Sequence, residues 1–96
     1  MKIVAEMSLY PLKDGPIPDI IAFIDQLRTQ PGLEVVSNQL STQLRGEFEA
    51  VTSAVNRCMR DAMGAPNTVV LVVKYLNVAP DLQRAPTLTP PGAGRD

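Results

Sequence analysis

Three polar side chains near the start of the chain have types and spacing that could perform chemistry together. Glu6, Ser8 and Tyr10 occupy alternate positions, so in an extended strand they point to the same side. A hydroxyl donates and accepts hydrogen bonds, a carboxylate accepts them, and an aromatic ring stacks on other rings or meets a cation face-on. This combination is suited to holding a small polar ligand.

The element that must position these groups is a strand over residues 2–10. Its other side is entirely apolar, with Ile3, Ala5, Met7 and Leu9 in alternation. We expect this apolar row to pack against helices. Pro11 has no N–H group for a strand ladder, so the strand should end there.

The rest of the chain predicts five further elements. The apolar spacing of Ile20, Phe23, Ile24 and Leu27 is helical, and Thr68 to Leu76 is rich in valine. In chain order, we expect a helix from Pro18 or Asp19 to Pro31-Gly32, strands at 33–39 and 40–45 in a hairpin, a helix from after Gly46 to a left-handed cap at Gly64, and a strand at 68–76.

The order β-α-β-β-α-β predicts the fold class α+β, as a ferredoxin-like βαββαβ sandwich. Its antiparallel four-stranded sheet should have the spatial order 4-1-3-2, with two helices on one face. Residues 1–78 form the predicted domain. Residues 79–96 form a predicted tail, because Pro80, Pro86, Pro90, Pro91 and two glycines leave little material for a core.

The sheet side that faces away from the helices, here called the open face, presents a choice of interpretations. Val70 and Val72 should lie on it, and a large exposed apolar patch is typical of an interface, most simply with a second copy. Ser41, Gln43 and Arg45 should share it with Glu6. Either these polar groups satisfy one another, with Glu6 paired to Arg45 or Lys74, or they form a ligand pocket.

Composition excludes several classes of protein. The formal net charge is −1, which argues against a nucleic-acid-binding protein, and no apolar run is long enough to cross a membrane. There is no histidine, and we expect no metal and no cofactor. The one cysteine, Cys58, allows no internal disulfide, which favours the cytoplasm; we expect it in the core, and Arg57, Arg60 and Asp61 on a solvated helix face.

Three short motifs are similar to those of a known family. Ser8-Leu9-Tyr10-Pro11-Leu12 resembles the S-x-Y-P-L signature of the YkoF-like thiamine-binding family. Leu40-Ser41-Thr42, followed by Gly46 and an acidic helix start, resembles the family's Met-Ser-Thr motif, with leucine in place of methionine. Tyr75-Leu76-Asn77 resembles its usual Ser-Asn ending, with Leu76 where serine is common. The similarity spans about residues 1–78.

This resemblance implies a ferredoxin-like fold that binds thiamine or its hydroxymethylpyrimidine part, as a homodimer or tetramer. The candidate ligand-binding residues are Ser8, Tyr10, Ser41, Thr42, Glu6 and Asn77.

Three functions follow from these observations, and the first is favoured. The protein is a non-enzymatic binding protein for such a ligand; or it is an oligomeric assembly or regulatory module without a ligand; or, less favoured, it is a cofactor-free enzyme. In the last case Glu6 is the candidate base on the open face, but one carboxylate without a partner is thin support for catalysis. We therefore expect no catalytic residues.

Overall fold

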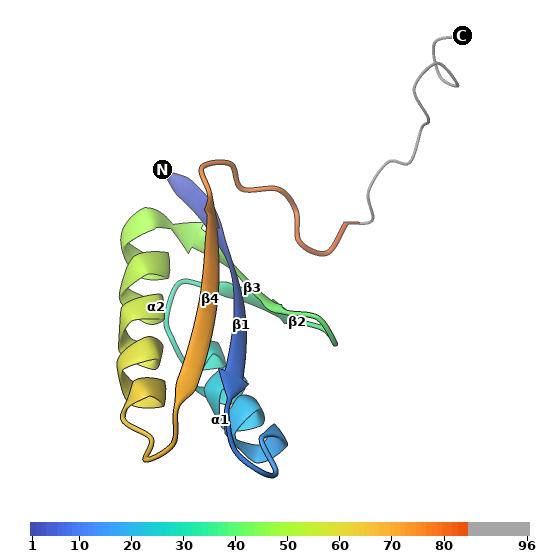
Figure 1. Cartoon of the computed structure of the whole chain (residues 1–96). Coiled ribbons are helices and arrows are strands. Elements are labelled where there is room, and N and C mark those ends of the chain that lie inside the picture. Colours follow the sequence, from blue (N-terminus) through green and yellow to red (C-terminus); the bar gives the residue numbers. More distant parts are fainter. Residues whose placement is uncertain (85–96) are drawn as a thin grey trace, which may run out of the picture.

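The predicted ferredoxin-like α+β fold is confirmed by a computed structural model, which describes residues 1–84 (Figure 1). Residues 85–96, most of the predicted tail, lie outside the described residues. The elements are β1 (Lys2–Pro11), α1 (Ile17–Arg28), β2 (Glu34–Ser37), β3 (Thr42–Glu47), α2 (Phe48–Met63) and β4 (Val69–Leu76).

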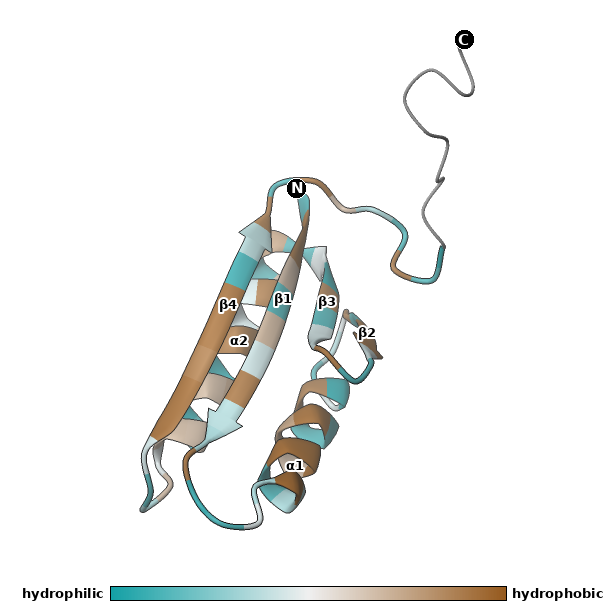
Figure 2. Cartoon of the chain, turned by 45° about the vertical axis from the view of Figure 1, so that its right-hand side comes forward, coloured by the Kyte–Doolittle hydropathy of each residue, from teal (hydrophilic) through white to brown (hydrophobic). Residues whose placement is uncertain are grey.

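The sheet has the predicted order, β2-β3-β1-β4, and each neighbouring pair is antiparallel. Its registers place Met7 opposite Thr42 on one side and opposite Val73 on the other. Both helices cover the same face, which leaves the other face of the sheet open (Figure 2). β1 is therefore a central strand with one covered side and one open side.

The core lies between β1 and the helices, as the alternation predicts. The four residues of the apolar row of β1 are buried. Leu44, which faces the same way from β3, is completely buried, and so is Cys58 of α2. Burial raises the pKa of the Cys58 thiol, which keeps it protonated at neutral pH. The residues that complete the core are Phe23, Leu27, Val51 and Val55.

The middle of the chain corrects several predicted boundaries. β2 is shorter than the predicted 33–39, and β3 lies two residues later than the predicted 40–45, because residues 38–41 form a loop instead. Gly46 lies within β3 and does not separate it from α2. α1 starts one residue earlier than predicted, at Ile17, and the cap at Gly64 is right-handed, with φ of −76°. Because Gly64 has an ordinary helical φ, the end of α2 does not use a left-handed residue.

Residues 79–84, at the start of the predicted tail, contact the sheet. Arg45 Nε donates a hydrogen bond to the carbonyl oxygen of Ala79 at 3.1 Å. Gln83 Nε2 donates to Glu34 Oε2 at 3.3 Å. The chain therefore stays beside β2 and β3 after β4 ends, at least as far as these residues.

Gly46 is a point of close approach between β3 and the turn before β2. A Cβ atom at this position would lie 2.8 Å from the carbonyl oxygen of Gly32 and 3.0 Å from Leu33 Cδ2. Gly32 has a positive φ of 74°, which fixes the turn that brings its carbonyl there. The backbone oxygen cannot move away without disturbing this turn.

We predict that Gly46→Ala lowers the free energy of unfolding by about 1–3 kcal/mol, the usual cost of overpacking. Gly64→Ala is the matched control, since its nearest neighbour atom is 3.4 Å away; it should change stability by no more than about 0.5 kcal/mol. Urea unfolding followed by circular dichroism measures both variants. Equal stabilities for the two would show that the close approach at Gly46 has no energetic weight.

Candidate functional site

The C-terminal end of β1 lacks a strand partner on one side. β1 pairs with β3 only from Lys2 to Met7, whereas its pairing with β4 continues to Pro11. Within the described residues, Ser8 to Pro11 therefore have a neighbouring strand only at β4. Backbone N–H and C=O groups on an unpaired edge are free to bind other groups.

The gap exists because the chain turns at Asn38. β3 therefore begins level with Met7 and does not extend beside Ser8 to Pro11. Its side-chain oxygen accepts hydrogen bonds from the backbone N–H groups of Leu40, at 2.9 Å, and Ser41, at 3.1 Å. The Asn38 N–H donates to the carbonyl oxygen of Ser41 at 3.1 Å. Asparagine commonly forms such turns by replacing strand hydrogen bonds with local ones. Ser8 Oγ then donates to the Leu40 carbonyl oxygen at 3.3 Å, which ties the loop to β1.

A cavity of about 210 Å³ fills this gap, and we call it the edge pocket. Ile20, Phe23 and Ile24 of α1 form its apolar wall. Its other lining residues come from β1 and from the segment that leads into β3: Met7, Ser8, Leu9, Tyr10, Ser37, Asn38, Gln39, Leu40, Ser41 and Thr42. The edge pocket therefore brings together four of the six predicted ligand-binding residues, namely Ser8, Tyr10, Ser41 and Thr42.

Glu6 lies beside the edge pocket and is linked to it through Ser41. Ser41 Oγ donates a hydrogen bond to Glu6 Oε2 at 3.0 Å and accepts one from Gln43 Nε2 at 3.2 Å. Lys74 Nζ lies 3.8 Å from Glu6 Oε1, so the predicted pairing with Lys74 is present. Arg45 instead pairs with Glu34 at 3.7 Å. The polar groups of the open face thus satisfy one another and still border a pocket.

Thr42 belongs to the edge pocket but points to the opposite side of the sheet from Ser41. It is buried, with 4% of its surface exposed. Its Oγ1 atom lies 2.8 Å from Ser37 Oγ, in a hydrogen bond that holds β2 against β3. This hydroxyl is therefore already engaged at the inner end of the pocket.

Asn77, the last of the six predicted ligand-binding residues, does not line the edge pocket. Leu76 pairs with Val4, so Asn77 comes level with Ile3 at the opposite end of β1 from Ser8. Five residues of strand separate these levels by about 16 Å. The reason is the antiparallel pairing, which places the end of β4 beside the start of β1. Asn77 lines a separate groove of about 440 Å³ with Phe48 and Tyr75.

The residues of the edge pocket that sequence reasoning missed are those of its wall and loop. Ile20 and Ile24 belong to the predicted apolar spacing of the helix, but they are only half-buried, and both line the cavity. Asn38 could have been found, since asparagine directly after a valine-rich strand is a turn signal. Leu40 is exposed, and a leucine at that position gives no such signal in the sequence.

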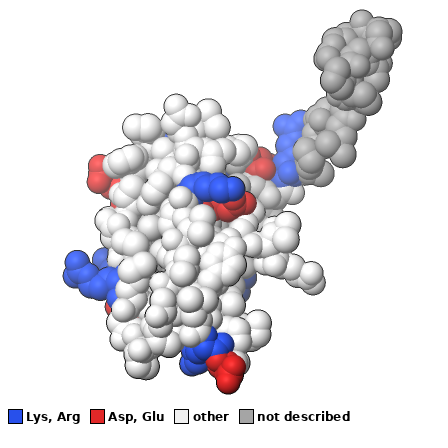
Figure 3. Space-filling view, in the orientation of Figure 1, with Lys and Arg blue, Asp and Glu red and all other residues white. Residues whose placement is uncertain are grey.

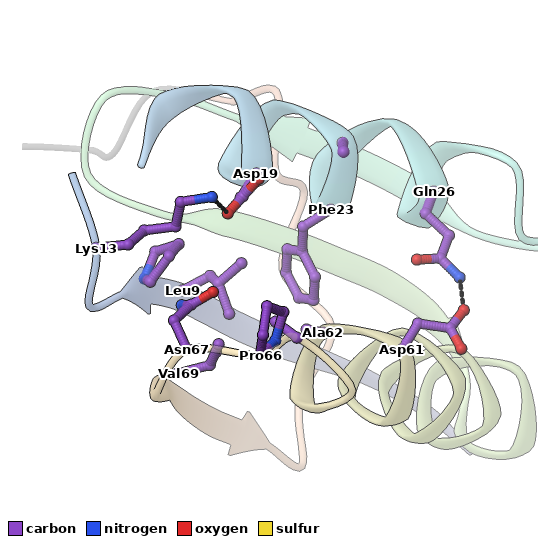
Figure 4. Close-up of a pocket in the computed structure, with 13 residues that line it drawn as sticks. Leu9, Lys13, Asp19, Phe23, Gln26, Asp61, Ala62, Pro66, Asn67 and Val69 are labelled. Atoms are coloured by element: carbon purple, nitrogen blue, oxygen red, sulfur yellow. Dashed lines mark hydrogen bonds and ion pairs between the residues drawn. The ribbon is translucent and has the colours of Figure 1, made fainter. Parts of the chain in front are cut away.

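A second cavity lies between the two helices, and we call it the interhelix pocket (Figure 4). Its volume is about 310 Å³. Lys13 Nζ contacts Asp19 Oδ2 at 3.0 Å at one end, and Gln26 Nε2 donates a hydrogen bond to Asp61 Oδ2 at the other. Asp61 was expected on a solvated face; it is exposed, but it also joins α2 to α1.

No group of histidine, cysteine, aspartate or glutamate side chains within residues 1–84 could hold a metal ion. Among the same residues, neither helix is long and apolar enough to cross a bilayer.

The fold and the edge pocket define a small ferredoxin-like protein with a cavity at the end of its first strand. No family model matches the chain, and comparison with curated protein sequences finds no match. Among solved structures, protein SP2199 from Streptococcus pneumoniae is 30% identical, with a TM-score of 0.66 and coverage of 85% of this chain and 91% of that one. The chain belongs to the same family as SP2199.

Two more distant structures share the fold. Protein MJ1052 from Methanocaldococcus jannaschii has a TM-score of 0.70 at 23% identity, over 83% of this chain and 84% of its own. Protein TM0486 from Thermotoga maritima has a TM-score of 0.62 at 17% identity, over 86% and 92% of the two chains. TM0486 is provisionally described as a thiamine biosynthesis/salvage protein.

Proposed function

We propose that this protein binds thiamine or its hydroxymethylpyrimidine part in the edge pocket, without transforming it. The observation that supports this most strongly is the meeting of Ser8, Tyr10, Ser41 and Thr42 around one cavity at the unpaired end of β1. These residues come from two motifs that are far apart in the sequence and that both resemble the YkoF-like thiamine-binding family. The provisional thiamine assignment of the structural neighbour TM0486 points the same way.

The volume of the edge pocket favours the pyrimidine part as the group that enters it. A cavity of roughly 150 Å³ accommodates benzene. At about 210 Å³, the edge pocket has room for a six-membered ring with small substituents but not for the whole of thiamine. The thiazolium ring would then extend outward. Tyr10, with 52% of its surface exposed, can meet that cation with its aromatic face.

The polar groups around the edge pocket complement an aminopyrimidine. Such a ring offers an amine donor beside a ring-nitrogen acceptor. The unpaired backbone of residues 8–11 carries both donors and acceptors. Ser41 Oγ donates its own proton to Glu6, so its remaining lone pair can accept a hydrogen bond from the ligand amine.

Binding without catalysis fits the way the nearest carboxylate is held. None of the described residues that line the edge pocket is an aspartate or glutamate. Glu6, the candidate base, is engaged by Ser41 and Lys74. We place the protein in the cytoplasm, where the protonated, buried thiol of Cys58 would stay reduced.

Isothermal titration of the full chain with hydroxymethylpyrimidine and with thiamine should give saturable binding of one ligand per chain. Tyr10→Ala should weaken thiamine binding about two- to fivefold, because a cation–π contact at an exposed site contributes about 0.5–1 kcal/mol. Tyr75→Ala is the matched control, since Tyr75 is similarly exposed, at 50%, but lies outside the edge pocket. It should leave the affinity unchanged.

Two results would remove this proposal. One is the absence of heat and of any thermal shift with both ligands. The other is equal loss of affinity in Tyr10→Ala and Tyr75→Ala, which would place the ligand elsewhere.

We further propose that the open face forms a homodimer with the same face of a second copy. In the single chain, 43% of Val70 and 44% of Val72 are exposed. Figure 2 shows hydrophobic residues along most of β4, and charged atoms are sparse over the surface around β4 and β1 (Figure 3). Face-to-face packing of two sheets would bury these valines in a shared layer. Pairing of two such dimers would give the tetramer.

Sedimentation velocity should find the wild-type chain as a dimer or tetramer. Val72→Glu should reduce the assembly by placing a charge in the shared apolar layer. Ile21→Glu is the control, since Ile21 is exposed to a similar extent, at 52%, but belongs to α1 on the opposite side of the sheet. A monomeric wild type, or dissociation by both variants alike, would contradict the open-face dimer.

A further inference from the structure

The interhelix pocket exists because small side chains face each other where the two helices could have met. Ala22 of α1 and Ala62 of α2 both line it. Its floor includes Phe23, which is buried, and Val69 at the start of β4. Figure 4 shows Phe23 and Ala62 between the two polar ends of the cavity. At about 310 Å³, it exceeds the roughly 150 Å³ that accommodates a benzene ring.

The charges at the interhelix pocket do not cancel. Lys13 is the one cation among its described lining residues, and Asp19 neutralises it at 3.0 Å. Asp61 is then left over, and within residues 1–84 it forms no ion pair. Its hydrogen-bond partner is the neutral amide of Gln26. The net formal charge of the side chains that line the interhelix pocket is therefore −1.

The position of Asp61 in α2 is also locally unfavourable. It lies in the last turn of the helix, where the carbonyl ends of the peptide dipoles already make the potential negative. Residues that depart from such local preferences are expected at functional sites. A cation placed beside Asp61 would be attracted by both the carboxylate and the helix end.

The interhelix pocket has side-chain acceptors that are available to a ligand donor. Gln26 uses one of its amide N–H groups on Asp61, and Asn67 Nδ2 donates one to the Thr68 carbonyl oxygen. This leaves the side-chain oxygens of both residues and the second Asp61 oxygen without a described donor. An ammonium group offers three N–H donors.

From this geometry we propose that the interhelix pocket is a second ligand site, which takes a small organic amine with an apolar body. The ammonium group binds Asp61 and the Gln26 oxygen, and the apolar body lies over Phe23 and Val69. The two proposals can be tested separately, because Asp61 lines only the interhelix pocket and Tyr10 only the edge pocket, although Leu9 and Phe23 line both.

The test is an NMR titration of the ¹⁵N-labelled full chain with three probes of one shape: benzylamine, benzyl alcohol and benzoate. Benzylamine should shift the amide signals of Ala22 and Ala62, which line only the interhelix pocket, with the highest affinity of the three, and benzoate the lowest. Asp61→Asn keeps a hydrogen-bond acceptor for Gln26 but removes the charge. It should weaken benzylamine binding about two- to fivefold, as expected for an exposed ion pair, and leave benzyl alcohol unchanged.

Two further variants test separately whether the charge of Asp61 and the space in the interhelix pocket are needed for binding. Asp25→Asn is the matched control, since Asp25 is an exposed carboxylate of α1 outside the interhelix pocket, 4.0 Å from Arg28; it should bind benzylamine as the wild type does. Ala62→Leu should narrow the cavity and weaken the binding of all three probes. Equal affinities for benzylamine and benzoate, no response to benzylamine, or shifts confined to the edge pocket would overturn the proposal.

Discussion

The turn that Asn38 makes with its own side chain is the constraint on which the candidate site depends. By capturing the N–H groups of Leu40 and Ser41, it ends the β2–β3 hairpin before β3 reaches the last residues of β1. A longer hairpin would give Ser8 to Pro11 a strand partner and would close the edge pocket. The same turn brings Ser41 next to Glu6 and the Leu40 carbonyl oxygen next to Ser8.

The edge pocket and the interhelix pocket meet at the same core residues. Leu9 of β1 and Phe23 of α1 line both the edge pocket and the interhelix pocket. β1 is thus the common element: its apolar row forms the core, its polar row forms the open face, and its C-terminal end borders both cavities. A ligand in either pocket would rest against side chains that also hold α1 on the sheet.

The fold could be predicted from the sequence because its signals are local and repeat. The alternation of β1 and the helical spacing of Phe23 and Leu27 each indicate an element and its buried side. The pocket could be predicted only in part. Ser8 and Tyr10 were placed correctly by alternation, but whether β3 extended beside them depended on one side-chain turn at Asn38. Asn77 was grouped with them by motif, and antiparallel pairing places it at the other end of β1.

The most direct test of the central claim is a crystal structure of the full chain with hydroxymethylpyrimidine. The account predicts the pyrimidine ring between the unpaired edge of residues 8–11 and α1, with hydrogen bonds to that backbone and to Ser41. A ring bound in the groove beside Asn77, or an edge pocket that stays empty at saturating ligand, would contradict it.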